Sequence, residues 1–148
     1  MSLGGDPAPA LDQAVCRSLA AGVTYVVAAG NEGSDAETSS PARVVQAITV
    51  AASDRNDRKP AWSNWGSLVD VFAPGVEIES DAPGGGTATM SGTSMASPHV
   101  AGAAALVLGR SPGLNPETVA YRIWSSASVG KLGNIGVGSP DRLLYVKE

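Results

Sequence analysis

The sequence predicts an α/β fold in three layers, with a mostly parallel sheet between layers of helices. Short apolar runs, typical of strands buried on both faces, alternate along the chain with stretches of helical periodicity. Parallel strands need helical connections of this kind. The 148 residues suit one domain, and the sequence has neither an internal repeat nor a domain boundary. Residues 1–148 are therefore predicted to form one unit.

The first half of the chain is predicted to hold one helix and three strands. Apolar residues at helical spacing predict a helix over Ala10–Ala20, which Gly22 ends. The β-branched and aromatic run Val23–Ala29 predicts a strand buried on both faces. Two further apolar runs, Val44–Ala52 and Leu68–Phe72, predict additional short buried strands.

The second half is predicted to hold a hairpin and two helices. Residues Val76–Met90 read as two short extended segments around a Pro-Gly-rich turn. Ser94–Gly109 is small and apolar all round, which predicts a helix buried on most sides. Asn115 is a capping residue ahead of a proline, so Pro116–Ser126 is predicted to be an amphipathic helix. Leu143–Val146 predicts a weak final strand.

The composition excludes several classes of partner. The net charge is −4 with no basic stripe, which argues against nucleic acid and against anionic membrane surfaces. The longest apolar run, Ala101–Leu108, is too short to span a bilayer, and no basic region precedes an apolar block at the N-terminus. Cys16 is the single cysteine, so an internal disulfide is excluded, and a buried structural thiol is expected.

Ser94 is the first candidate for chemistry. The triplet Gly92-Thr93-Ser94 places a serine where a turn enters the predicted buried helix. A helix N-terminus offers unpaired N–H groups and a positive dipole end, both of which favour developing negative charge. Taken alone, Ser94 would more simply cap the helix. The nucleophile-elbow pattern G-x-S-x-G is not met, because Ala96 takes its last glycine position.

The longer string around Ser94 decides between these interpretations. Residues Ser91–Gly102 (SGTSMASPHVAG) resemble the signature around the nucleophile of the subtilisin-like serine proteases. Upstream, Ala28–Asn31 resembles the oxyanion-hole segment of that family, and Ser2–Gly5 resembles the strand that forms one wall of its substrate cleft. The resemblance runs from Met1 to about Tyr145. Three further segments are similar to the proteinase K branch: Ala52–Arg58, Ser63–Ser67 and Asp70–Gly75.

The resemblance implies a three-layer subtilisin-like fold, represented here by its C-terminal half, and a serine endopeptidase activity. Ser94 would attack the scissile carbonyl and form an acyl-enzyme. The Asn31 side chain would stabilise the oxyanion together with the Ser94 N–H. Outside this context, Asn31 would be a turn residue that tolerates left-handed backbone.

The resemblance also implies a substrate cleft and broad specificity. An extended peptide can add as a strand to an exposed edge and form main-chain hydrogen bonds with it. Small, uncharged side chains in the first pocket favour an apolar or aromatic residue before the scissile bond. The edge would be Ser2, Leu3 and Gly4, and the pocket would be lined by Ala28, Ala29 and Gly30.

A structural calcium ion is a further expectation, although the chemistry requires no cofactor. In the proteinase K branch, a strong site uses two main-chain carbonyls and an aspartate, which here fall on Val45, Ala47 and Asp70. Ligands that offer only oxygen suit Ca²⁺. In the alternative interpretation, Asp70 is a solvated or turn-capping carboxylate.

The aspartate and histidine of the catalytic triad have no candidates in the sequence. The one histidine, His99, lies five residues after Ser94 and about 140° around the helix axis, so we interpret it as a packed helix residue. The family signatures D-[ST]-G and H-G-T-H do not occur, and both normally lie N-terminal to this region. Residues 1–148 are therefore expected to be part of a peptidase domain, inactive alone.

Two further expectations concern partners and location. An incomplete parallel sheet would expose an edge, which favours pairing with a complementing N-terminal half or with a second copy. The alternative function is a non-catalytic remnant that binds peptides or self-associates. The family resemblance implies a secreted protein that acts on peptides or proteins.

Overall fold

A three-stranded parallel sheet forms the centre of the fold. The computed structural model describes residues 1–146, and the sheet consists of β1 (Val26–Ala28), β2 (Ile48–Ser53) and β3 (Val71–Pro74) in the order β1-β2-β3. Every residue of β1 and β2 is buried, as expected for strands covered on both faces. The predicted α/β class with a parallel sheet is confirmed.

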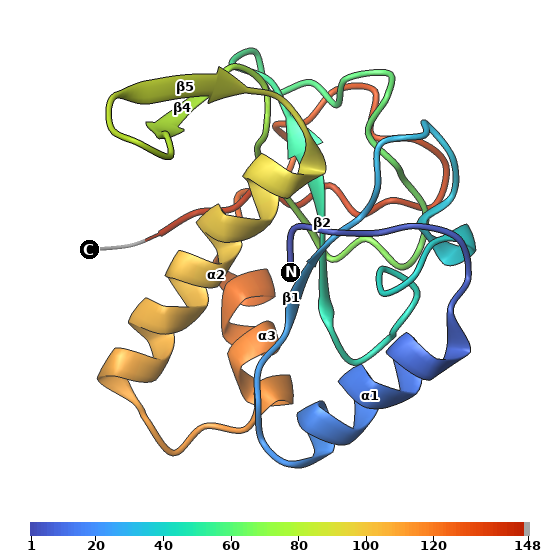
Figure 1. Ribbon diagram of the computed structural model, residues 1–148, viewed down its shortest axis with the longest axis vertical. Helices are drawn as coiled ribbons and strands as arrows, with labels where there is room; N and C mark the ends of the chain where they lie inside the picture. Colours follow the sequence, from blue (N-terminus) through green and yellow to red (C-terminus); the bar gives the residue numbers. More distant parts are fainter. Residues whose placement is uncertain (147–148) are drawn as a thin grey trace.

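Three helices cover the two faces of this sheet (Figure 1). They are α1 (Pro9–Ala20), α2 (Thr93–Arg110) and α3 (Pro116–Ser126), and each predicted helix is confirmed to within one residue at either end. A single turn of 3₁₀-helix, η1 (Ala36–Thr38), lies in the loop after β1. The Asn115 side chain accepts a hydrogen bond from the Thr118 N–H, 2.8 Å away, which caps α3 as predicted.

Successive residues of the strands belong to different clusters of the core. Val26, Ile48 and Val50 pack with α2 and α3 on one face. Val27 packs with Val15 and Leu19 of α1 on the other face, since side chains of a strand alternate between its two sides. The predicted three layers are therefore helix, sheet and helix.

The predicted hairpin is also confirmed. The strands β4 (Ile78–Asp81) and β5 (Thr87–Met90) pair antiparallel, with Ile78 opposite Met90. The turn between them contains Gly84, one of three consecutive glycines with positive φ. The hairpin is largely exposed and extends away from the sheet at the end where α2 begins (Figure 1).

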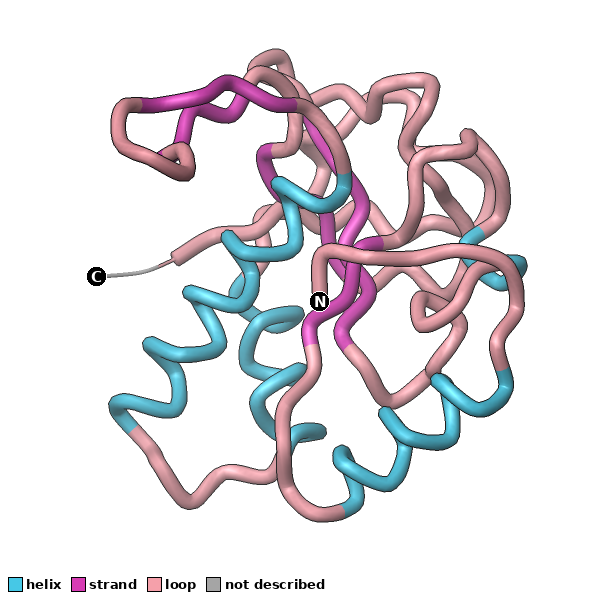
Figure 2. Tube along the Cα trace, in the orientation of Figure 1, coloured by secondary structure: helices cyan, strands magenta, loops and turns pink. Residues whose placement is uncertain are grey.

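The sheet strands are shorter than the apolar runs that predicted them, and loops account for much of the chain (Figure 2). β1 begins three residues late because its pairing with β2 begins at Val26, and Val23 is half exposed. Val45 is 72% exposed because residues 41–47 form turns before β2. β3 begins at Val71, where its ladder with β2 starts. At the C-terminal end, Leu143 forms only isolated bridges, to Phe72 and Ser128.

The prediction that the helix at 94–109 is buried on most sides is wrong. Along α2, residues such as Val100 and Ala104 face the sheet, whereas Ala101, Ala105 and Leu106 are exposed. No other element of the described chain covers that side. Among residues 1–146, no helix combines the length and apolar character needed to cross a membrane.

Candidate active site

The loop after β1 and the start of α2 form the candidate site. Ser94 is the second residue of α2, and Asn31 lies three residues beyond the end of β1. Residues after the carboxyl ends of parallel strands meet at the same edge of a sheet, which is where α/β proteins usually bind ligands. The predicted pairing of Ser94 with Asn31 therefore corresponds to neighbours in space.

Thr93 joins the two segments directly. Its N–H and its hydroxyl each donate to the Asn31 Oδ1 atom, both at 2.9 Å. The Thr93 hydroxyl in turn accepts from the Gly30 N–H, at 3.2 Å. With its oxygen fixed in this way, the Asn31 amide presents its NH₂ group as the free end. Thr93 was not predicted as a site residue, because its only signal in the sequence is its position directly before the candidate nucleophile.

The Ser94 hydroxyl contacts the N-terminal segment of the chain. It donates to the Ser2 carbonyl at 3.3 Å, and the Ser2 hydroxyl donates to the Ser94 carbonyl at 2.8 Å. The Ser2 and Ser97 hydroxyls are also within hydrogen-bonding distance, 3.0 Å. Ser94 is half-buried, so its hydroxyl is accessible from one side.

The segment that contains Ser2, Leu3 and Gly4 is fixed at both ends and exposed between them. At one end, the Met1 ammonium donates to the Val26 carbonyl, and the Ala28 N–H donates to the Met1 carbonyl. At the other end, Gly5 and Ser40 exchange two main-chain hydrogen bonds, of 3.1 and 3.0 Å. Residues 2–4 are exposed. A further strand could therefore pair with this segment.

These segments surround a small cavity. Ala29 does not line it, contrary to our expectation, because its side chain is fully buried in the core cluster that contains Phe72. The cavity has a volume of about 50 Å³ and is lined by Leu3, Gly4, Gly5, Ala28, Gly30, Asn31, Glu32, Thr93 and Ser94. Glu32 lines the cavity as well, although it was not among the predicted site residues.

His99 is not among the residues that line this cavity. Its Nδ1 atom is 2.8 Å from the Met95 carbonyl, one turn earlier in α2. The side chain is exposed, so our interpretation of His99 as a packed residue is wrong. His99 is exposed because it lies on the side of α2 that no other described element covers, which also carries Ala101 and Ala105.

The predicted calcium ligands lie near the opposite, amino-terminal end of the strands. Asp70 directly precedes β3; its N–H donates to the Thr49 carbonyl at 2.9 Å, and its Oδ2 accepts from the Thr49 N–H at 2.8 Å. Thr49 follows Ala47 by two residues, so Asp70 and the turn before β2 are close. Burial raises the pKa of the Asp70 carboxyl to about 7, although the Thr49 N–H and the Arg142 guanidinium favour its charged form.

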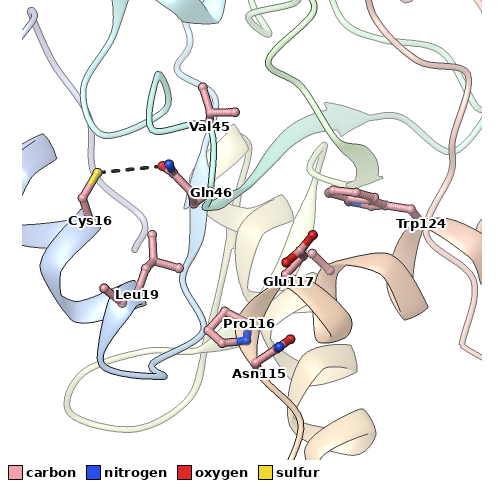
Figure 3. Close-up of a pocket in the computed structure, with 10 residues that line it drawn as sticks. Cys16, Leu19, Val45, Gln46, Asn115, Pro116, Glu117 and Trp124 are labelled. Atoms are coloured by element: carbon pink, nitrogen blue, oxygen red, sulfur yellow. Dashed lines mark hydrogen bonds between the residues drawn. The ribbon is translucent and has the colours of Figure 1, made fainter.

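A larger pocket, about 490 Å³, lies between α1, α3 and the turn before β2 (Figure 3). The Cys16 thiol is half-buried there and 3.8 Å from the Gln46 Oε1 atom, so it is less buried than we expected. The Trp124 Nε1 atom is buried and has no hydrogen-bond partner. Ser94 and Asn31 are not among the residues that line this pocket.

Comparison with known proteins identifies the family. The sequence model described as the subtilase family matches residues 1–142. The chain belongs to the subtilase family. Subtilases are serine proteases, so the family-level resemblance inferred from the residues around Ser94 is confirmed.

Individual relatives of this subtilase chain carry protease names. It is 49% identical over 145 residues to alkaline serine exoprotease A of Vibrio alginolyticus and 50% identical over 149 residues to a cuticle-degrading serine protease of Arthrobotrys oligospora. Each match covers 98% of this chain but only 27% and 36% of the relative. The chain thus spans about a third of the length of these curated relatives.

Solved structures agree with the fold of the subtilase chain. A cold-adapted subtilisin-like serine proteinase superposes with a TM-score of 0.96 at 47% identity. The match covers 98% of this chain and 53% of that structure. A protease from Pseudoalteromonas arctica superposes with a TM-score of 0.89 at 27% identity, over 97% of this chain and 47% of that one. The subtilisin-like fold is confirmed for this chain.

A pair of glycine substitutions tests the packing behind the candidate site. Gly30 and Gly84 both have positive φ, 106° and 88°. A methyl group at Gly30 would overlap the Asn64 amide and lie 2.6 Å from the Glu32 Oε2 atom, whereas one at Gly84 would meet nothing within 4 Å. Both alanine variants incur about 1–2 kcal/mol of backbone strain. We expect Gly30→Ala to lower the free energy of unfolding by about 1–3 kcal/mol more than Gly84→Ala.

Urea denaturation followed by circular dichroism measures both variants. Equal losses for Gly30→Ala and Gly84→Ala would contradict the close approach of Asn64 to Gly30.

Proposed function

We propose that this chain supplies the nucleophile and the oxyanion-binding groups of a serine endopeptidase. Ser94 attacks the scissile carbonyl, and the Asn31 amide and the Ser94 N–H receive the negative charge of the tetrahedral intermediate. The observation that carries the proposal is the double donation from Thr93 to the Asn31 Oδ1 atom. It orients the amide NH₂ as a donor before any substrate binds, which is how preorganised electrostatic stabilisation works.

The substrate binds as an added strand along Ser2–Gly4. The exposed main chain of this segment supports the proposal, because it offers N–H and carbonyl groups to an extended peptide. The side chain before the scissile bond then enters the cavity bordered by Ala28 and Gly30. Apolar or aromatic side chains are favoured there, and specificity is broad.

Proton transfer requires a base from outside the described site. A catalytic serine needs a histidine to accept its proton and a carboxylate to orient that histidine. His99 is bound to the main chain of its own helix. We propose that an aspartate and a histidine reach Ser94 from a complementing polypeptide segment, and that residues 1–148 alone are inactive. The exposed side of α2, with Ala101, Ala105 and Leu106, supports such an interface.

The same exposed side favours a second candidate function. A subtilase remnant could bind a peptide on Ser2–Gly4, or pair with a second copy through α2, without hydrolysis. We also propose an extracellular location, since one relative is named as a cuticle-degrading protease. Recovery of the protein from culture medium would support this location, and its retention in the cell would contradict it.

Covalent labelling distinguishes the enzyme from the remnant. We expect a fluorophosphonate probe to label Ser94 when the chain is mixed with the N-terminal portion of a related subtilase that carries the aspartate and histidine. The chain alone should react poorly, because its serine has no base. Mass spectrometry locates the label. Ser94→Ala should abolish it, and Ser91→Ala, a nearby serine whose hydroxyl contacts the Glu77 N–H, should retain it.

Labelling of the chain alone would contradict the requirement for a complementing segment. Absence of labelling in a mixture that forms a stable complex by size-exclusion chromatography would favour the non-catalytic remnant.

Substrate preference is measured on the same reconstituted mixture. We expect peptides with Phe or Leu before the scissile bond to be cleaved with a kcat/KM at least about 10-fold higher than the matched Asp peptide, because the Glu32 carboxylate at the cavity repels a second negative charge. A preference for Asp would contradict the proposed pocket.

We propose that Ca²⁺ is bound by the carbonyls of Val45 and Ala47 and by the Asp70 carboxylate. All three donors are oxygen atoms, which Ca²⁺ prefers. The hydrogen bonds between Asp70 and Thr49 hold the carboxylate next to the turn that carries the two carbonyls. Among residues 1–146, no three His, Cys, Asp or Glu side chains are grouped so that they could hold a metal ion by themselves, and the proposed site takes two of its three ligands from the main chain. The ion would stabilise the fold and take no part in the chemistry.

Thermal unfolding with and without Ca²⁺ checks this proposal. At 100 times the dissociation constant, Ca²⁺ should add about 2.7 kcal/mol to the free energy of unfolding and raise Tm. Asp70→Asn should remove this gain, whereas the matched change Asp81→Asn on the exposed hairpin should preserve it. An equal Ca²⁺ response in all three proteins would contradict the site.

A further inference from the structure

Asn64 uses every hydrogen-bonding group of its side chain on the loop that carries Asn31. The residue lies in the connection between β2 and β3, and its side chain is fully buried. Its Oδ1 atom accepts from the Glu32 and Ser34 N–H groups, both at 3.0 Å. Its Nδ2 atom donates to the Ala29 carbonyl and to the Glu32 Oε2 atom, both at 2.9 Å. A buried amide with this pattern specifies one conformation of the loop.

The contact with Glu32 extends to Asn31 itself. The Glu32 Oε2 atom that accepts from Asn64 also accepts from the Asn31 N–H, at 2.8 Å. The Asn64 N–H donates to the Gly30 carbonyl at 3.0 Å. The main chain on both sides of Asn31 is therefore connected to Asn64, while Thr93 fixes the end of the Asn31 side chain.

Gly30 makes this arrangement sterically possible. The Asn64 amide and the Glu32 carboxylate occupy the space that a side chain at residue 30 would fill. Gly30 also has a φ of 106°, which turns the chain so that Asn31 faces the start of α2. Asn64 thus packs against Gly30, the residue directly before Asn31, at a distance that only glycine permits.

We propose that Asn64 is a positioning residue for Asn31 and acts through Glu32 and Gly30. The inference rests on the proposed function, because it assigns Asn64 a role in placing an oxyanion donor. Such a donor is effective only within a narrow range of distance and angle, and a displacement of about 1 Å can cost about 100-fold in rate. Asn64 itself touches neither the substrate nor the reacting atoms.

The decisive measurement is a double-mutant cycle in the reconstituted enzyme. Asn64→Leu keeps the approximate size of the side chain and removes its polar groups. We expect it to lower kcat by about 10-fold or more and to change KM by less than about 2-fold, since the lost interaction acts in the transition state. In an Asn31→Ala background, the same substitution should change kcat by less than about 2-fold. An equal loss of kcat in both backgrounds would mean that Asn64 serves general stability, and would overturn the proposal.

Glu32 provides a second test if Asn64→Leu fails to fold. Because Glu32 is exposed, Glu32→Ala should fold while it removes the acceptor shared by Asn31 and Asn64. We expect Glu32→Ala to lower kcat, Glu32→Gln to restore most of it through its amide oxygen, and the exposed control Glu79→Ala to match the unmodified protein. A Glu32→Ala variant with unchanged kcat would contradict the proposal that Asn64 positions Asn31 through Glu32.

Hydrogen exchange separates this inference from the proposed function. In the chain without a complementing segment, Asn64→Leu should speed amide exchange at Asn31, Glu32 and Ser34, and leave exchange within α3 unchanged. If the unmodified mixture shows no turnover, the proposed function fails, and the exchange result alone decides the positioning role. Unchanged exchange at these three amides would overturn it.

Discussion

The hydrogen bonds from Thr93 to the Asn31 Oδ1 atom are the interaction on which the candidate site depends. They join the first turn of α2 to the loop after β1, two segments that are 62 residues apart in the sequence. Without them, Ser94 would be an ordinary residue near a helix N-terminus, and Asn31 an exposed turn residue. The core places both segments at one edge of the sheet, but only this link sets the direction of the Asn31 amide.

Local patterns in the sequence were sufficient for most of the fold. Asn115 and Pro116 predicted the start of α3, and Gly22 predicted the end of α1, because caps depend on residues close in sequence. Strand boundaries were less accurate: the apolar run that includes Val45 extends beyond the ladder. A strand begins where a neighbour pairs with it, and the neighbour is distant in sequence. For the same reason, the exposure of His99 was missed.

The site shows the same division between local and long-range information. A family signature indicated Ser94 and Asn31, but their supports, Thr93 and Asn64, appeared only when the folded chain placed them beside Asn31. Asn64 has no local signal that distinguishes it from any asparagine in a turn. Ala29 was assigned to the pocket through the family resemblance, yet its side chain faces the core. The alternation of side chains along a strand predicts this outcome, since neighbours face opposite sides.

The two halves of the proposed chemistry place different demands on the described residues. The proposed oxyanion binding needs fixed dipoles, for which the Asn31 amide and the start of α2 are the candidates, while the buried Asn64 amide lies behind Asn31. Proton transfer needs a base that reaches the Ser94 hydroxyl from the substrate side, and His99, five residues further along α2, is turned away from Ser94 by about 140° around the helix axis. The His99 Nδ1 atom instead lies 2.8 Å from the Met95 carbonyl of its own helix. In the proposed function the base comes from a complementing segment, and a segment that packs on Ala101, Ala105 and Leu106 would also bury the exposed apolar side of α2.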